Sequence, residues 1–410
     1  MKIVAKYIML CLMLISTSLF SKRLKEGTYR GIFILNAEKN IELPFNFDVA
    51  YKGKKPSIII RNADERIVVD EIMIKGDSVN FKMPVFDTEF KTVLVGNNLE
   101  GFWINNYKAT NNKIRFKAVY GEARRFLFEP GKPDPVFEGR WETTFSPGSK
   151  DSSKAIGVFK HAEQTDFMSG TFLTETGDYR YLEGIKNGNT MYLSCFDGGH
   201  AFMFIAEYNA GNLSGNFYSG ATWVEPWTAR RNNNFKLADA EEITFVKNRD
   251  EKINFSFADV NKKQVSLSDK KFENKPVIIQ VMGSWCPNCM DESVYFSHLY
   301  KQYNNEGLEI IALAFEKTTD RDKATAQVLR MKNRLKIEYD VLITQQTGKE
   351  KAGEILTALN KITAFPTTIF LNREHRIVKV HTGFSGPATG SEYDIYKQRT
   401  ENLVKQLLKE

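Results

Sequence analysis

Residues 276–289 read Pro-Val-Ile-Ile-Gln-Val-Met-Gly-Ser-Trp-Cys-Pro-Asn-Cys. The apolar run at 276–282 predicts a buried strand, and the residues from Met290 to Tyr303 predict a helix. A Cys-x-x-Cys pair between a strand and a helix places both sulfurs at the helix N-terminus, where unpaired amides and the helix dipole stabilise a thiolate. The thiol of Cys286 then attacks a disulfide, and the thiol of Cys289 resolves the mixed disulfide. This stretch therefore indicates redox chemistry.

Two other uses of a Cys-x-x-Cys pair fit the sequence less well. A closed zinc site needs two further ligands. The other cysteines are Cys11 and Cys195, and the five histidines show no paired spacing. A structural disulfide over so short a loop constrains little of the unfolded chain and adds little stability. We therefore expect neither a metal nor a cofactor.

Two motifs in this order resemble the thioredoxin superfamily, and more closely its branch of TlpA- and ResA-like exported thiol–disulfide oxidoreductases. The first motif is the Cys-x-x-Cys turn. The second is Ala364-Phe365-Pro366-Thr367-Thr368-Ile369-Phe370-Leu371, which matches the cis-proline strand of the family. Phe257-Ala258-Asp259 matches the lead-in of the branch. The resemblance covers about residues 253–410 and implies an α/β thioredoxin-like fold there.

The resemblance also implies a role for each site residue. Cys286 would be the exposed nucleophile with a low pKa, and Cys289 the more buried resolving thiol. Pro366 would be cis and lie against the cysteines, which leaves the backbone of Phe365 free to pair with a substrate segment. The residues in contact with substrate would be Trp285, Pro287 and Phe365. The branch implies protein disulfides as substrates and a reductant fed by a membrane-linked electron donor.

Glu292 is the candidate for acid–base chemistry. In a helix it shares one face with Phe296, Leu299 and Tyr303, and these neighbours indicate that the face turns inward. A carboxylate there would be desolvated, with a raised pKa suited to moving a proton to or from the cysteines. The ResA-like branch carries an acidic residue at this position, whereas Gln280 stands where thioredoxin has its buried Asp. The alternative is a solvated carboxylate that the helix dipole favours.

Two other functions remain open at this stage. A peroxiredoxin has an overlapping fold, but its Pro-x-x-x-Thr-x-x-Cys loop would need a Thr at the position of Gly283. The other alternative is a β-domain that binds a ligand or partner, with a thioredoxin-like domain that only senses redox state. The aromatic residues of the N-terminal half would then line a cavity instead of forming a core.

The N-terminus predicts export. Lys2 and Lys6 precede the apolar run 7–14, which small residues follow, so we expect a signal peptide at 1–21 and a location in the periplasm or cell envelope. An uncleaved membrane anchor is the alternative. The net charge is +7, and removal of the two lysines leaves +5. Since the basic residues are scattered, nothing indicates a nucleic-acid partner. The oligomeric state is not predicted.

The length of the whole chain, 410 residues, suits two or three domains. Short alternating runs between Gly, Asn and Asp turns predict antiparallel β structure from about 25 to 235. A faint repeat relates Gly27 to Gly139 and the segment from Asn98 to that from Asn212, about 112 residues on. The predicted organisation is all-β unit 1 at 24–130, a Pro-rich joint at 130–135, β-unit 2 at 136–235, a linker at 236–252 and the thioredoxin-like domain at 253–410. In that domain we expect a mixed sheet of four or five strands, and a helix over 350–360 among others. The two β-units either pack together or each close alone.

Overall fold

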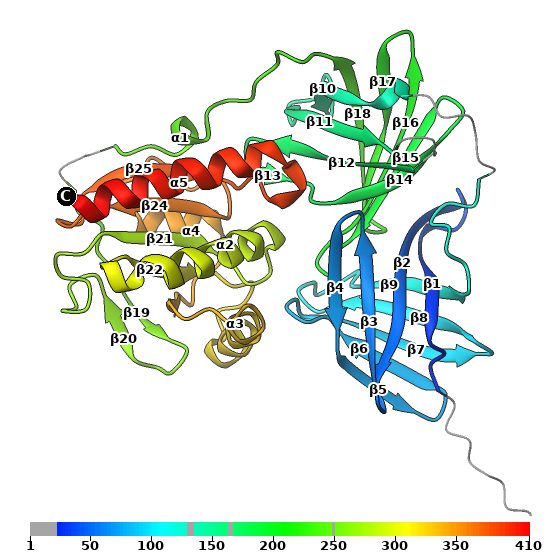
Figure 1. The fold of residues 1–410 in the computed structure, drawn as a ribbon, viewed down its shortest axis with the longest axis horizontal. Coiled ribbons are helices and arrows are strands. Elements are labelled where there is room, and N and C mark those ends of the chain that lie inside the picture. Colours follow the sequence, from blue (N-terminus) through cyan, green and yellow to red (C-terminus); the bar gives the residue numbers. More distant parts are fainter. Residues whose placement is uncertain (1–22, 129–134, 163–166, 248–250) are drawn as a thin grey trace, which may run out of the picture.

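The structure is a computed structural model that describes residues 23–128, 135–162, 167–247 and 251–410. It contains two antiparallel β-barrel sheets in the N-terminal half and a mixed α/β domain in the C-terminal part (Figure 1). The multidomain fold class predicted from the sequence is therefore confirmed. The predicted signal peptide, nearly all of the Pro-rich joint and part of the predicted linker lie outside the described residues.

The first barrel is a nine-stranded antiparallel sheet in the order β4-β3-β2-β1-β9-β8-β7-β6-β5. Its strands are β1 (Gly27–Asn36), β2 (Ile41–Lys52), β3 (Lys55–Asn62), β4 (Glu65–Val69), β5 (Glu71–Lys75), β6 (Ser78–Lys82), β7 (Thr88–Val95), β8 (Asn98–Asn105) and β9 (Lys113–Tyr120). Burial alternates along β7, as expected when one face of a strand turns to the core. β4 and β5 are the two ends of this sheet, although they follow each other in the chain.

The second barrel closes on itself. Its order is β11-β10-β18-β17-β16-β15-β14-β12-β13, and an additional ladder joins β11 to β12. Its strands are β10 (Gly139–Phe145), β11 (Ser153–His161), β12 (Phe167–Thr174), β13 (Gly177–Asp178), β14 (Leu182–Asn187), β15 (Thr190–Phe196), β16 (Ala201–Asn209), β17 (Asn212–Ser219) and β18 (Trp223–Arg231), preceded by the 3₁₀ turn η1 (Pro135–Phe137). Closure removes exposed strand edges.

The sequence repeat is confirmed in the two barrels. Each contains nine strands, and neighbours in the first barrel correspond to neighbours in the second when nine is added to the label. β1 and β10 begin at Gly27 and Gly139, both with positive φ. β8 and β17 begin at Asn98 and Asn212. The drift in spacing between the repeats therefore falls in the turns.

Aromatic side chains fill the barrel interiors. In the second barrel, Trp141, Phe172, Phe204 and Trp227 are buried in one apolar cluster. These side chains form a core, as expected for aromatic residues at strand positions, and this weakens the alternative of a ligand cavity.

Phe196 joins the two barrels, because this residue of β15 packs into the core of the first barrel. Its ring centroid lies 4.9 Å from that of Phe33, 4.8 Å from Phe45 and 5.6 Å from Phe90. Asn62 of β3 exchanges two hydrogen bonds with the backbone of Phe196, at 2.9 and 3.2 Å. The two units thus pack together, and the first barrel contains a side chain from the second.

Phe196→Ala is expected to lower the free energy of unfolding by about 3–5 kcal/mol, the usual cost of removing a buried phenylalanine ring. Urea unfolding of the full chain measures this cost. The matched control is Phe102→Ala, since Phe102 on the outside of the first barrel is 44% exposed. Equal effects of the two substitutions would contradict the described packing of Phe196.

The C-terminal domain is a mixed sheet of seven strands, β20-β19-β23-β22-β21-β24-β25, covered by helices. Its strands are β19 (Ser256–Asp259), β20 (Gln264–Ser266), β21 (Val277–Met282), β22 (Glu309–Ala314), β23 (Asp340–Ile343), β24 (Thr367–Leu371) and β25 (Ile377–Thr382). Its helices are α1 (Ala240–Ile243), α2 (Pro287–Tyr303), η2 (Asn304–Glu306), α3 (Arg321–Leu335), α4 (Gly348–Ile355), η3 (Pro387–Thr389) and α5 (Ser391–Lys409). None of the helices in the described ranges is long and apolar enough to cross a membrane.

Three details of this domain differ from the predictions. The count of four or five strands was wrong, because the lead-in forms the hairpin β19–β20, and β19 pairs with β23 at the sheet edge. Helix α2 begins at Pro287, three residues before the predicted start. Helix α4 ends at Ile355 and not at 360, because the backbone that follows pairs with the predicted linker: Lys247 N–H donates to the Ala358 carbonyl at 2.8 Å.

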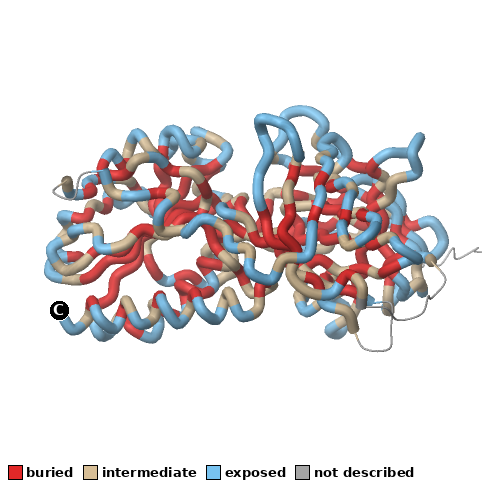
Figure 2. The backbone as a smooth tube through the Cα atoms, turned by 90° about the horizontal axis from the view of Figure 1, so that it is seen from above, coloured by how far each residue is buried: buried red, intermediate tan, exposed pale blue. Residues whose placement is uncertain are grey.

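Helix α3 fixes the C-terminal domain to the first barrel. Arg330 donates to the carbonyl of Met83 at 2.8 Å and pairs with Glu71 at 2.9 Å, and Arg334 pairs with Asp70 at 3.1 Å. One apolar cluster runs from the first barrel into the C-terminal domain and includes both cysteines of the motif. Figure 2 shows buried backbone continuing through the middle of the molecule.

Candidate active site

The two cysteines sit at the junction of β21 and α2, and they are joined as a disulfide with their Cα atoms 5.2 Å apart. Cys286 is the N-cap of α2, and its sulfur lies 3.2 Å from the amide nitrogen of Cys289. The helix dipole and this amide both stabilise a thiolate on Cys286 in the dithiol form. The expectation of an exposed Cys286 was wrong, because Cys286 is 7% exposed and therefore buried, while Cys289 is 0% exposed. The more accessible sulfur is thus the one that the N-terminus of the helix stabilises.

Glu292 lies one helical turn after Cys289 and is fully buried. Its carboxylate accepts hydrogen bonds from Thr368 at 2.7 Å, Gln280 at 2.8 Å and Tyr396 at 3.0 Å. Burial raises the pKa of Glu292 to about 7, although these three donors oppose the shift. Burial therefore favours the protonated form of Glu292, and the alternative of a solvated carboxylate was wrong.

Gln280 connects Glu292 to Cys289. Its amide group donates to Glu292 and lies 3.4 Å from the carbonyl oxygen of Cys289, and its oxygen accepts from Ser293 at 3.1 Å. All three side chains are buried. Gln280 thus fixes the carboxylate beside the cysteine turn, while Glu292 is the group that titrates.

The predicted substrate-contact residues surround Cys286. The peptide bond between Phe365 and Pro366 is cis, and the carbonyl oxygen of Phe365 lies 3.4 Å from the sulfur of Cys286. The ring of Trp285 makes an edge contact with that of Phe365 at 5.8 Å. Trp285 and Phe365 are half-buried, whereas Pro287 is buried. The chain therefore brings the two distant motifs together at one sulfur.

Glu316 is a second buried carboxylate at this site, and the sequence analysis missed it. Ser284 donates to it twice, through its amide at 2.8 Å and its hydroxyl at 2.7 Å, and burial raises the pKa of Glu316. The next residue, Lys317, places its ammonium group 3.7 Å from the centre of the Trp285 ring. Both residues follow the apolar strand β22, with only Phe315 in between. A polar pair at the carboxyl end of a core strand was the available signal.

Comparison with known proteins assigns the C-terminal part of the chain to a protein family. Residues 247–396 match the Redoxin family. This part of the chain is a Redoxin domain. The thiol–disulfide oxidoreductase ResA of Halalkalibacterium halodurans is 30% identical over 131 residues, which is 32% of this chain and 66% of that protein. ResA of Bacillus subtilis is 28% identical over 130 residues, which is 32% of this chain and 64% of that protein. The chain thus spans just under two thirds of these relatives.

Solved structures also resemble the Redoxin domain. A thiol-disulfide oxidoreductase from Bacteroides fragilis has a TM-score of 0.28 at 16% identity, over 36% of this chain and 99% of that one. A secreted thiol-disulfide isomerase from Corynebacterium glutamicum has a TM-score of 0.31 at 18% identity, over 43% of this chain and 97% of that one. The thioredoxin-like resemblance stated from the sequence is confirmed, as distant homology to ResA, for the Redoxin domain.

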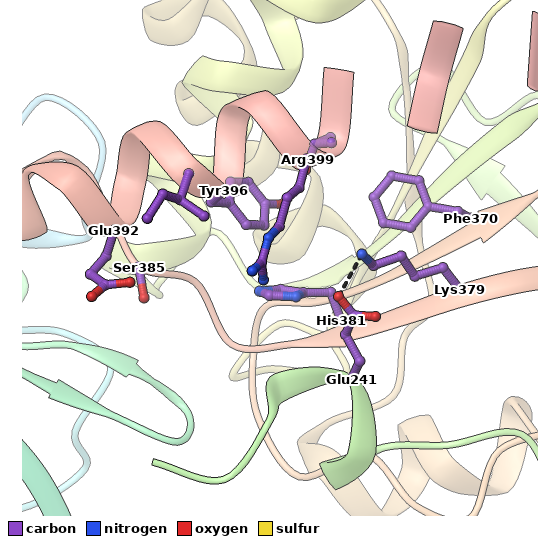
Figure 3. A pocket seen from close by; sticks show the side chains of 10 residues that line it. Glu241, Phe370, Lys379, His381, Ser385, Glu392, Tyr396 and Arg399 are labelled. Atoms are coloured by element: carbon purple, nitrogen blue, oxygen red, sulfur yellow. Dashed lines mark ion pairs between the residues drawn. The ribbon is translucent and has the colours of Figure 1, made fainter. Parts of the chain in front are cut away.

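A cavity of about 110 Å³ lies between α5 and β25 of the Redoxin domain (Figure 3). Tyr396, His381 and Arg399 are among the residues that line it. The ring of His381 packs against that of Tyr396 at 4.9 Å, and burial lowers the pKa of His381 to about 4, so this imidazole is neutral at pH 7. Tyr396 thus contacts both the cavity and Glu292.

The other cysteine in the described ranges lies in the second barrel and outside this site. Cys195 is a free thiol, fully buried in the core of the second barrel, and burial raises its pKa far above the usual range. It is a small core residue, as expected from its strand position. Among the described residues, no group of three or more His, Cys, Asp or Glu side chains is arranged to hold a metal ion.

Proposed function

We propose that this protein is a thiol–disulfide oxidoreductase that reduces disulfides in protein substrates. The observation that carries the proposal is the position of Cys286 at the N-cap of α2, beside the Cys289 amide and one turn from the buried Glu292. The homology of the Redoxin domain to ResA supports the same chemistry.

The reaction balances over two sulfur exchanges. The Cys286 thiolate attacks a substrate disulfide, forms a mixed disulfide and releases one substrate thiolate, which takes up a proton. Cys289 then gives its proton to Glu292 and attacks the Cys286 sulfur, which releases the second substrate thiolate. The two electrons come from the dithiol, which ends as the Cys286–Cys289 disulfide. A membrane-linked donor of electrons would return the pair to the dithiol.

We place this reaction in the periplasm or cell envelope, because residues 1–21 have the pattern of a signal peptide. In this setting a supply of electrons from across the membrane is needed, since a surrounding oxidant keeps the pair as a disulfide. Fractionation of cells, with mass determination of the mature chain, distinguishes a cleaved protein from one that retains residues 1–21 as an anchor. Recovery of the whole chain in the cytoplasm would overturn this location.

The reduction potential of the cysteine pair tests the direction of the reaction. We expect a reduction potential closer to that of thioredoxin, about −270 mV, than to that of the oxidant DsbA, about −120 mV. Equilibration in dithiothreitol buffers, followed by alkylation of free thiols and mass measurement, gives the potential. Cys195→Ala is the control for labelling of Cys195. A value at the oxidising end would contradict the role as a reductant.

A further inference from the structure

A hairpin of the second barrel lies directly against the cysteine turn. The turn Glu175-Thr176 joins β12 to β13, and Figure 1 shows β13 beside the first turns of α5. Asn288, between the two cysteines, donates to the carbonyl oxygen of Asp178 at 3.2 Å. A Cβ added to Gly177 would lie 2.1 Å from the Asn288 side-chain nitrogen. The hairpin thus approaches the redox pair as closely as a residue without a side chain allows.

The same hairpin covers the loop between β25 and η3. The carboxylate of Asp178 accepts from the amide of Gly386 at 2.5 Å. A Cβ added to Gly383 would lie 2.6 Å from the carbonyl carbon of Thr176. Backbone therefore lies on backbone here, so the hairpin itself occupies this side of the cysteine turn.

Arg180 holds the hairpin in place. Its buried guanidinium donates to the carbonyl oxygen of Pro287 at 3.1 Å and forms an ion pair with Asp291 of α2. It also pairs with Glu65 of the first barrel and, at 3.2 Å, with Asp197 of the second. One side chain thus links both barrels to the Redoxin domain. Removing one partner would leave a buried charge uncompensated, so these contacts fix the position of the hairpin.

The loop at Gly198 and Gly199 of the second barrel further restricts access to Cys286. A Cβ added to Gly199 would lie 3.2 Å from Cγ of Pro287, and Thr88 of the first barrel donates to the carbonyl of Gly198 at 2.6 Å. The side of Cys286 that these two loops leave open is lined by the half-buried rings of Trp285 and Phe365 and by the exposed Lys317.

We propose that the hairpin at 174–178 determines the substrate specificity of the redox pair. It blocks the Asn288 side of Cys286, so a disulfide partner reaches the sulfur only past Trp285, Lys317 and Phe365. The favoured partner is an exposed, extended segment with a disulfide, and compact folded proteins that dock across the whole turn are excluded. This inference rests on the proposed function for its substrate. Whether the hairpin at 174–178 covers the Asn288 side of Cys286 can be tested without any catalytic turnover.

Two substitutions are expected to open the blocked side. Asp178→Ala removes the acceptor for the Gly386 amide, and Gly177→Ala places a methyl group against Asn288. The probes are N-ethylmaleimide and a maleimide on a 5 kDa polyethylene glycol chain, applied to full-length protein with Cys11→Ala, Cys195→Ala and Cys289→Ser. At Cys286, we compare the labelling rate of the polyethylene glycol maleimide with that of N-ethylmaleimide. We expect each opening substitution to raise this ratio at least about fivefold. Asp151→Ala, an exposed residue in the β10–β11 turn, should leave the ratio unchanged.

The outcomes separate the cover from the catalytic activity. A ratio that stays within twofold of the control in both variants, with circular dichroism showing intact folds, would overturn the specificity role. With both cysteines present, the opened variants should gain turnover of insulin relative to a small aromatic disulfide by a similar factor. A changed labelling ratio without turnover of either disulfide supports the cover and refutes the proposed function.

Discussion

Replacing Cys286 by serine is expected to lower the rate of disulfide reduction by about three orders of magnitude or more, because the attacking thiolate is lost. The loss should be this complete since Cys289 is 0% exposed and cannot take over the attack on a protein. Reduction of insulin by dithiothreitol in the presence of the full chain measures the effect.

Cys289→Ser provides the informative comparison. It keeps the nucleophile and removes the resolving thiol, so the mixed disulfide between Cys286 and the substrate should accumulate. Non-reducing electrophoresis and mass measurement detect this species. Trapping in Cys286→Ser but not in Cys289→Ser would reverse the assigned roles of the two cysteines.

Glu292→Gln is expected to slow the reaction by about 10²-fold, the usual effect of losing a positioned general base. The wild-type rate should rise with pH through about 7, where the Glu292 carboxyl loses its proton and becomes able to accept one from Cys289. In the variant this rise should disappear. Glu306→Gln, an exposed change of the same charge, is the control. An unchanged pH profile in Glu292→Gln would remove Glu292 from the mechanism.

The same substitution changes how stability depends on pH. Because burial raises the pKa of Glu292 to about 7, the protonated form stabilises the fold. This contribution is complete below the ordinary pKa of 4.5 and is lost as the pH rises through 7, at most about 3 kcal/mol in all. Urea unfolding of Glu292→Gln at pH 5 and pH 8 should show a smaller difference than the wild type.

Local pattern predicted the redox pair and its immediate surroundings. The strand–turn–helix order around Cys286 and the inward helix face that carries Glu292 both follow from spacing along a few turns of chain. The β-barrels follow from alternation and from the repeat. The hairpin β19–β20 was missed because its strands have only four and three residues, too few for a periodic signal.

Contacts between residues far apart in the chain could not be predicted from the sequence pattern. Arg180 lies over a hundred residues before Asp291, and nothing near it in the chain marks an arginine that will be buried. Phe196 reads as an ordinary inward residue at a strand end, and the alternation shows neither that its ring leaves its own barrel nor which core receives it. Such contacts depend on how whole domains dock.

The position of Phe196 also affects when the first barrel can complete its core during synthesis of the chain. The ribosome makes the N-terminal barrel first, but the ring that completes its core belongs to residue 196. Strands β1 to β9 therefore emerge with an unfilled apolar interior and reach their final packing only when β15 has followed. Until residue 196 has been made, the first barrel lacks one of the rings of its core.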